Sequence, residues 1–191
     1  PLTFERRSTD WGMNAQEVKI NEPVQPTWEL RSPILESSEQ RVAYRTQIEG
    51  IDTSLTYTFY EDKLAQANYL FEPKHDDGAD YVQDFHKVKT WITQSYGMPT
   101  LVQEIWLDSL YRYDQSLWGQ AVMRGHLKMV AEWRNETTLI TLLLDGGADT
   151  IGLMADFDSV AIVPPAPMQA SVLEEIPAME EMPVAENPIT E

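Results

Sequence analysis

The stretch that decides the fold is Arg41–Glu72, RVAYRTQIEGIDTSLTYTFYEDKLAQANYLFE, in which apolar and polar residues alternate along three runs. A period of two places every second side chain on one face of a half-buried antiparallel strand. The positions that share such a face are Val42, Tyr44, Thr46 and Ile48 in the first run, Leu55, Tyr57 and Phe59 in the second, and Ala65, Ala67, Tyr69 and Phe71 in the third. The stretch therefore predicts three strands, with a tight connection near Glu61 and Asp62.

The period changes directly after this stretch. Between Asp80 and Tyr96 the apolar residues recur every three or four positions, which is the spacing of one helical face. They are Tyr81, Phe85, Val88, Ile92 and Tyr96. Acidic residues at 76, 77 and 80 suit the start of a helix, and Gly97 followed by Pro99 suits its end.

Two shorter helices are predicted on either side. Asn14 and Glu17 have the spacing of a capping box, which predicts a helix over about 15–21 that Pro23 stops. The other is expected over about 114–124, with Asp114 as its cap and Gly125 as its stop. Its inward residues are expected to be Leu117, Trp118, Ala121 and Val122.

Three further strands follow, in HLKMVAEW (126–133), TTLITLLLD (137–145) and DTIGLMADFDS (149–159), with turns at Asn135-Glu136 and Gly146-Gly147. Two runs of strands separated by helices predict an α+β fold, an antiparallel sheet with helices packed on one face. The order also suggests a two-fold echo, in which a helix followed by a meander occurs in each half of the chain.

The sequence changes character near Val163. From Pro164 to Glu191 it contains six prolines and six glutamates, and no lysine, arginine, aromatic residue or glycine. Such a composition is too poor in apolar residues to form a core. We expect a single domain over 1–160 and a disordered acidic tail over 161–191, which either keeps the protein in solution or folds on a partner through SVLEEIPAMEEM.

The charge excludes several kinds of partner. Against 31 Asp and Glu residues the chain has 14 Lys and Arg residues, for a net charge of −17. Nucleic acid and anionic membrane surfaces both require a basic patch, so neither is an expected partner. An excess of this size favours basic partners or cations.

There is no cysteine, which excludes disulfides, thiolate metal sites and a cysteine nucleophile. The longest apolar run, LITLLL at 139–144, is far too short to span a bilayer. The chain begins at Pro1, and we expect a periplasmic or secreted protein whose signal peptide has been removed, with a cytoplasmic location as the alternative.

Three islands carry a family resemblance. WGMNAQEVK (11–19) resembles the WGM-x-x-x-EV opening of small exported bacterial proteins, and is similar to the starts of outer-membrane assembly lipoproteins and β-lactamase-inhibitor-like domains. SYGMPT (95–100) and EWRNETTLITLLL (132–144) resemble the helix end and the strand pair of uncharacterised exported proteins. The resemblance implies a short helix before antiparallel strands, an exported setting and the binding of other proteins. The chain lacks the anchoring cysteine of the lipoproteins and has INEPVQP where their LG-x-P stands.

The best cluster of catalytic-type side chains is KHDDGAD, Lys74 to Asp80. A histidine beside paired carboxylates is able to hold a divalent cation or to perform acid–base catalysis, whereas an acidic turn before a helix usually caps it. His75, His86 and His126 have no zinc-site spacing, and DGGAD (145–149) is interpreted as a hairpin loop rather than a calcium loop.

The remaining candidates are aromatic and acidic residues. Trp91, Trp118 and Trp133 fall near apolar stripes and are expected in the core. Trp11, Trp28 and Trp106 lie in weakly patterned segments, where they either tether loops or anchor a partner. Asp156 and Asp158 are expected on the outward face of a strand.

The sequence thus predicts a non-enzymatic, exported protein-interaction or structural module of the bacterial cell envelope. We assign no catalytic, cofactor-binding or metal-binding residue, expect no cofactor, and expect an unidentified protein partner. The alternative is a hydrolase or ligand-binding protein with an acidic or metal-assisted site near His75–Asp80.

Overall fold

A computed structural model describes residues 9–31, 39–148 and 150–163 of the chain. Its helices are α1 (Ala15–Asn21), α2 (Gly78–Tyr96), the short 3₁₀ helix η1 (Gln115–Leu117) and α3 (Trp118–Met123). Its strands are β1 (Trp28–Arg31), β2 (Glu39–Ile48), β3 (Ile51–Tyr60), β4 (Lys63–Phe71), β5 (Leu101–Trp106), β6 (Leu127–Arg134), β7 (Thr138–Gly147) and β8 (Thr150–Ser159). The tail predicted over 161–191 lies almost wholly outside the described residues.

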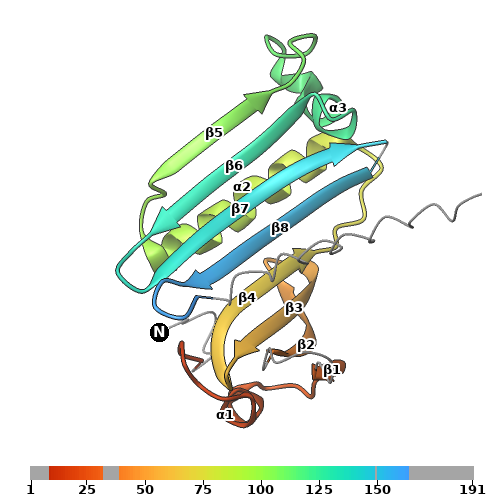
Figure 1. Ribbon diagram of the computed structural model, residues 1–191. Helices are drawn as coiled ribbons and strands as arrows, with labels where there is room; N and C mark the ends of the chain where they lie inside the picture. Colours follow the sequence, from red (N-terminus) through yellow and green to blue (C-terminus); the bar gives the residue numbers. More distant parts are fainter. Residues whose placement is uncertain (1–8, 32–38, 149, 164–191) are drawn as a thin grey trace, which may run out of the picture.

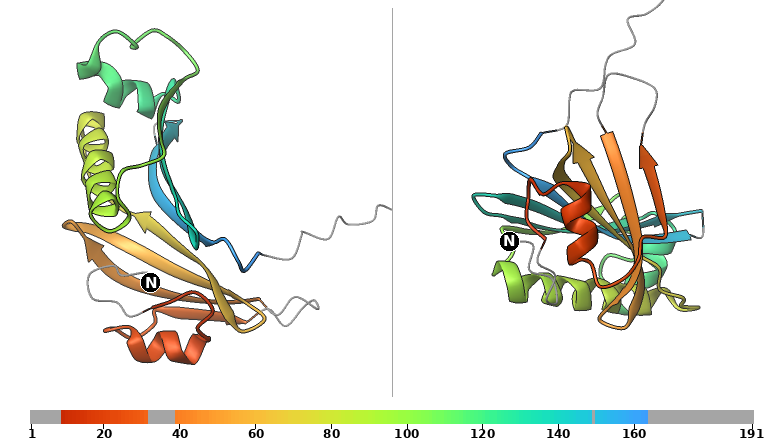
Figure 2. Two further views of the ribbon diagram at one scale, coloured as in Figure 1. Left: turned by 90° about the vertical axis from the view of Figure 1, so that its left-hand side faces the viewer. Right: turned by 90° about the horizontal axis from the view of Figure 1, so that it is seen from below.

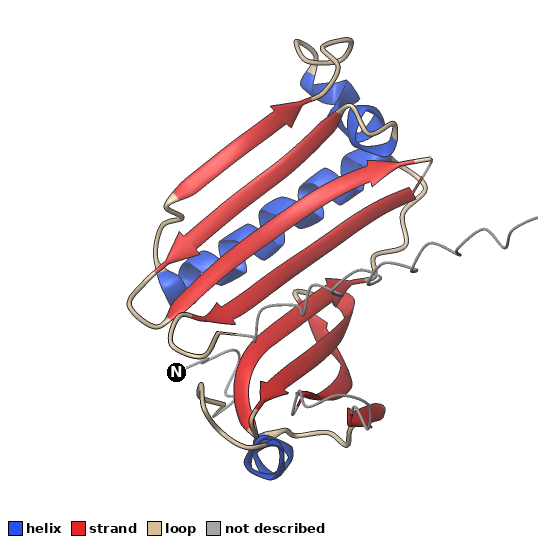
Figure 3. Cartoon of the chain, viewed as in Figure 1, coloured by secondary structure: helices blue, strands red, loops and turns tan. Residues whose placement is uncertain are grey.

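All eight strands belong to one antiparallel sheet in the order β1-β2-β3-β4-β8-β7-β6-β5 (Figures 1 and 3). The predicted α+β class and antiparallel sheet are confirmed. The six predicted strands are present, and the sequence analysis missed β1 and β5, which form the two edges. Strands β4 and β8 pair at the middle of the sheet. They join one four-stranded half, β1 to β4, to the other, β5 to β8, and we call these halves the two meanders.

The turns between strands follow from backbone conformation. Glu49 and Gly50 connect β2 to β3 with φ of 51° and 79°, and Glu61 and Asp62 connect β3 to β4 with φ of 50° and 60°. Two successive residues with positive φ make a turn whose twist matches that of the flanking strands. The tight connection predicted at Glu61 and Asp62 is therefore confirmed.

One face of the sheet, here called the inner face, carries the buried side chains of every strand from β2 to β4 and from β6 to β8. The cross-strand pairs Tyr57↔Ala67, Ala67↔Phe157 and Ile140↔Phe157 carry this face across the middle of the sheet. The face is apolar from one meander to the other, so a single core forms on it.

Helix α2 packs on this inner face (Figure 2). The ring of Trp91 contacts Tyr69 edge-on at 5.8 Å between centroids, and Tyr69 in turn contacts Phe157 at 5.3 Å. Asp77 caps the helix by accepting a hydrogen bond from the Ala79 N–H at 2.9 Å. The helix that the period predicted from Asp80 is confirmed and begins two residues earlier, at Gly78.

The opening stretch holds α1 against the sheet. The capping box is present, with the Glu17 N–H donating to Asn14 and the Asn14 N–H donating to Glu17. Trp11 donates from its indole N–H to the Thr138 hydroxyl at 2.9 Å, and the Tyr57 hydroxyl donates to Glu22 at 2.5 Å. Trp11 is therefore a tether between the N-terminal segment and β7.

Helices α2 and α3 meet through glycine. A Cβ atom on Gly119 would lie 2.1 Å from the Gly78 carbonyl carbon and 2.2 Å from the Ala79 nitrogen, distances that side-chain carbons do not adopt. The two backbones therefore touch directly at this crossing, and any side chain at either glycine forces the helices apart.

We predict that Gly119→Ala lowers the free energy of unfolding by about 3 kcal/mol, because overpacking outweighs the roughly 1 kcal/mol that alanine contributes to a helix over glycine. Urea unfolding followed by circular dichroism measures the change. Gly152→Ala is the control, since its Cβ would meet only Asp145 Oδ1 at 3.5 Å, an ordinary contact. An unchanged midpoint for Gly119→Ala would contradict the close crossing.

Candidate functional site

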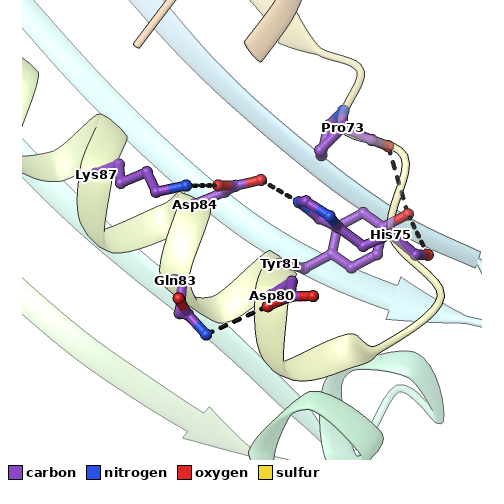
Figure 4. A network of polar contacts seen from close by, with 7 residues as sticks. All are labelled: Pro73, His75, Asp80, Tyr81, Gln83, Asp84 and Lys87. Atoms are coloured by element: carbon purple, nitrogen blue, oxygen red, sulfur yellow. Dashed lines mark hydrogen bonds and ion pairs between the residues drawn. The ribbon is translucent and has the colours of Figure 1, made fainter. Parts of the chain in front are cut away.

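The strongest polar network in the described residues joins the loop after β4 to helix α2 (Figure 4). Asp84 is 1% exposed, and its two carboxylate oxygens have different partners. His75 Nε2 lies 2.6 Å from Oδ2, and Lys87 Nζ lies 2.7 Å from Oδ1. A buried carboxylate is costly unless it is paired and hydrogen-bonded, and both conditions hold here.

The loop carrying His75 is held at a second point. The Tyr81 ring packs edge-on against the His75 ring at 5.1 Å between centroids. The Tyr81 hydroxyl lies 3.4 Å from the Pro73 carbonyl oxygen and 3.5 Å from that of His75, to which it donates long hydrogen bonds. The contacts of Tyr81 and Asp84 fix the path of the chain as it leaves the sheet and enters α2.

The side chains of His75, Asp76, Asp77 and Asp80 do not converge on one point as a metal or acid–base site would require. Asp77 is occupied as the cap of α2, and Asp80 accepts a hydrogen bond from Gln83 at 3.3 Å. His75 pairs with Asp84 instead of with Asp76, Asp77 or Asp80. Within the part of the chain that the structure describes, no group of three or more His, Asp and Glu side chains could hold a metal ion.

Asp84 is the functional-type residue that sequence reasoning missed. The sequence pattern could have indicated it. Asp84 precedes Val88 by four residues and Trp91 by seven, and this spacing places its carboxylate on the buried face of α2. A buried charge requires partners, and Lys87, three residues further along the same helix, supplies one of them. Identifying the other partner as His75 requires the path of the loop, which sequence periodicity does not give.

An open groove of about 440 Å³ runs beside the network along α2. It is lined by Glu49, Gln83, His86, Lys87, Thr90, Trp91 and Gln94. Among these lining residues the groove offers one carboxylate and one imidazole, which is too few for a convergent acid–base pair with an orienting group.

The face of the sheet opposite the inner face, here called the outer face, carries a polar ladder where β4 meets β8. Gln66 donates from Nε2 to Asp158 Oδ1 at 2.7 Å, and Asn68 donates to Asp156. The placement predicted for Asp156 and Asp158 is confirmed. Burial raises the pKa of Asp156, the Asn68 hydrogen bond opposes this shift, and the charge of Asp158 adds to it.

Large apolar side chains are exposed just before β5, on β5 itself and in the loop that follows it. The exposed fractions are 80% for Met98, 40% for Leu101, 52% for Val102, 66% for Leu107, 66% for Leu110 and 92% for Tyr113. We call these six residues the β5 patch. Exposed apolar side chains gathered in one region mark interaction sites more often than scattered ones do.

The base of the loop after β5 is firmly packed. Trp106 contacts Trp118 edge-on at 5.7 Å, and Tyr111 stacks on His126 at 5.8 Å with the Arg124 guanidinium 5.9 Å from the Tyr111 ring. Trp106 therefore tethers the loop. Trp28, on the other edge strand, is 48% exposed.

Comparisons of the chain with protein-family models, with curated proteins and with solved structures gave no match. Among the helices that the structure describes, none combines the length and apolar character needed to cross a membrane.

We predict that Asp84→Asn lowers the free energy of unfolding by about 2 kcal/mol, because the amide leaves both His75 and Lys87 without a charged acceptor. Chemical denaturation at pH 7 measures the loss. Asp80→Asn, a change at a half-buried residue of the same helix that keeps an acceptor for Gln83, is the control and should cost at most about 0.5 kcal/mol. Equal effects for the two variants would show that Asp84 does not organise the loop.

Asp156→Asn should stabilise the protein relative to the wild type, and more so at pH 7 than at pH 4. Since folding raises the pKa of Asp156 above its ordinary value of 3.8, the folded state holds that proton more tightly than the unfolded state does. Wild-type stability is therefore lost as the pH rises from near 3.8 through the folded pKa, and the asparagine variant lacks this loss. Urea unfolding at both pH values tests the sign, and a stabilisation by the variant that does not grow between pH 4 and pH 7 would contradict it.

Proposed function

We propose that this protein is a non-enzymatic, exported protein-interaction or structural module of the bacterial cell envelope. The observation that carries the proposal is the β5 patch, which exposes six large apolar side chains beside an edge strand. Such surfaces are suited to contact with another protein. The exported setting is supported by the resemblance of residues 11–19 to the openings of small exported bacterial proteins.

The arrangement of the helices is part of this proposal. We take all three helices to cover the inner face, which leaves the outer face and the two edges to partners. Ala15 and Val18 of α1 belong to the same core cluster as Phe85 and Val88 of α2, which supports this arrangement.

The alternative is a hydrolase or ligand-binding protein with a site near His75–Asp80. The contacts there favour a structural role, because His75 is engaged by Asp84 and Asp77 is engaged in capping. Such a site would need carboxylates free to meet a substrate or cation, together with convergent partners.

The experiment is a crosslinking pull-down from native extract with the full chain and with a chain that ends at Val163. The domain over 1–160 is proposed to carry recognition, so the same partners are expected with both. Loss of all partners from the shorter chain would assign recognition to residues 164–191 and overturn that placement.

The double variant Asp76→Asn/Asp77→Asn tests the alternative function. It should retain the wild-type set of partners, with a small loss of stability of about 1 kcal/mol from the weakened helix cap. Quantitative comparison of the crosslinked partners measures the first effect, and urea unfolding measures the second. Loss of partner capture by a folded double variant would favour the acidic-site alternative.

A further inference from the structure

We propose that β5 binds an extended, basic segment of a partner protein, which adds to the sheet as a further strand. The inference rests on the proposed function and names the surface and the chemistry of the partner. Strand addition derives its affinity from backbone hydrogen bonds and its specificity from the side chains that alternate along the added strand.

The backbone of β5 is free to accept such a strand. In the described sheet β5 pairs with β6 alone, in the register Trp106↔Leu127. The next residue, Leu107, donates its N–H to the carbonyl oxygen of His126 at 2.8 Å, and the unbroken register assigns the same direction to the odd-numbered residues within β5. Thr100, which precedes the strand, also donates to β6, at 2.7 Å from the carbonyl oxygen of Glu132. In an antiparallel pair these directions alternate, so Val102 and Glu104 direct their N–H and C=O groups away from the sheet.

The two edges of the sheet differ in how they are protected. Native proteins block strand addition with short edge strands and with charged or proline residues. Strand β1 has four residues, of which Glu29 and Arg31 are charged and Trp28 and Leu30 are exposed apolar residues, so it is shorter and more charged than β5. Strand β5 has six residues, and Glu104 is its one charge. Its first four residues are exposed, and they include Leu101 and Val102. The β5 edge is therefore the better template for a strand.

Charge selects the occupant. Glu104 is exposed, and its charge acts on His86 of α2, whose pKa is lowered by burial and by Lys89 while Glu104 opposes this shift. Glu132 lies opposite Leu101 on the outer face, and Asp108 follows the strand.

Lys128, the basic residue of β6 nearest to Glu104 in register, lies 3.5 Å from Asp145 as an ion pair. Glu104 pairs with the buried Met129 and so lies on the inner side of the edge, opposite to Glu132. A lysine or arginine on the inner side of the added strand would face Glu104, and one on the outer side would face Glu132.

Charge repulsion disfavours two other occupants of the β5 edge. A second copy of the chain would bring a further net charge of −17 to this edge. The segment from Pro164 to Glu191 carries six glutamates and no lysine or arginine, so it meets Glu104 with the same sign of charge. A basic segment is attracted both locally and by the overall charge, which also speeds its approach.

The test uses the full chain labelled with ¹⁵N and two short blocked peptides as probes, one alternating valine with lysine and the other alternating valine with glutamate. The lysine peptide should shift the amide signals of Val102 and Glu104 and slow their hydrogen exchange. At low salt it should bind about tenfold more tightly than the glutamate peptide, and this preference should shrink at high salt.

Val102→Pro is the blocking variant. Its N–H points away from β6, so proline removes a donor to the added strand without removing one from the sheet, and proline is tolerated at such edge positions. Val102→Thr keeps both the N–H and the branched side chain and is the matched control. The proline variant should lose at least about tenfold in affinity for the lysine peptide, and the threonine variant should bind as the wild type does.

Three results would overturn the inference. They are no shift at β5 with either peptide, equal binding of both peptides, and a dimer of the peptide-free chain in sedimentation that Val102→Pro dissociates, which would make a second copy the occupant. The proposed function fails separately. If Val102→Pro still captures the wild-type partners from extract, the module binds through another surface, and only the role of β5 is rejected.

Discussion

The pairing of β4 with β8 is the interaction on which the rest of the structure depends. Each meander is local, but the pair Asn68 and Asp156 joins residues 88 positions apart. Bringing the ends of so long a segment together costs conformational entropy, and this cost precedes the favourable contacts between the two strands. The pairing makes the inner face continuous. The rings of Tyr69 and Tyr96 both pack against the ring of Phe157, and the Tyr69 contact forms only when β4 and β8 are adjacent. Without this seam the inner face is divided in two, and Trp91 of α2 loses its contact with Tyr69 of β4.

The polar ladder on the outer side of the seam explains how its register is specified. A shift of one residue would carry Asp156 and Asp158 to the apolar inner face and expose Phe157. The two carboxylates can only accept hydrogen bonds, and Asn68 and Gln66 supply the donors opposite them. The raised pKa of Asp156 shows that burial there carries an electrostatic cost. In return, the two carboxylates specify the register, because any one-residue shift would bury them on the apolar face.

Sequence patterns predicted the elements that bury one face and missed those that do not. The six strands with a period of two and the three helical regions follow from alternation, capping and turn residues that act locally. Strand β5 was missed because its first four residues are all exposed, so no alternation is imposed on them, and β1 is too short to show a period. His75 was considered together with Asp76, Asp77 and Asp80, whereas it pairs with Asp84, because a pattern along the chain cannot show that Asp84 turns toward it. The close crossing of Gly78 and Gly119 was not predicted either, because two glycines far apart in the sequence give no periodic pattern that indicates contact between their backbones.

The missing pattern of β5 has a physical meaning of its own. Alternation arises where one face of a strand is buried and the other is wet, so a strand whose faces are both exposed shows none. Charge on an edge strand opposes aggregation, and β1 alternates the charged Glu29 and Arg31 with the exposed Trp28 and Leu30. Strand β5 instead combines Leu101, Val102 and Ile105 with one glutamate, and the packed rings of Trp106 and Trp118 hold its end in place. Apolar residues on an edge strand favour aggregation unless the edge is covered, which is why we propose that another chain adds to β5 and that the charge of Glu104 favours a basic one.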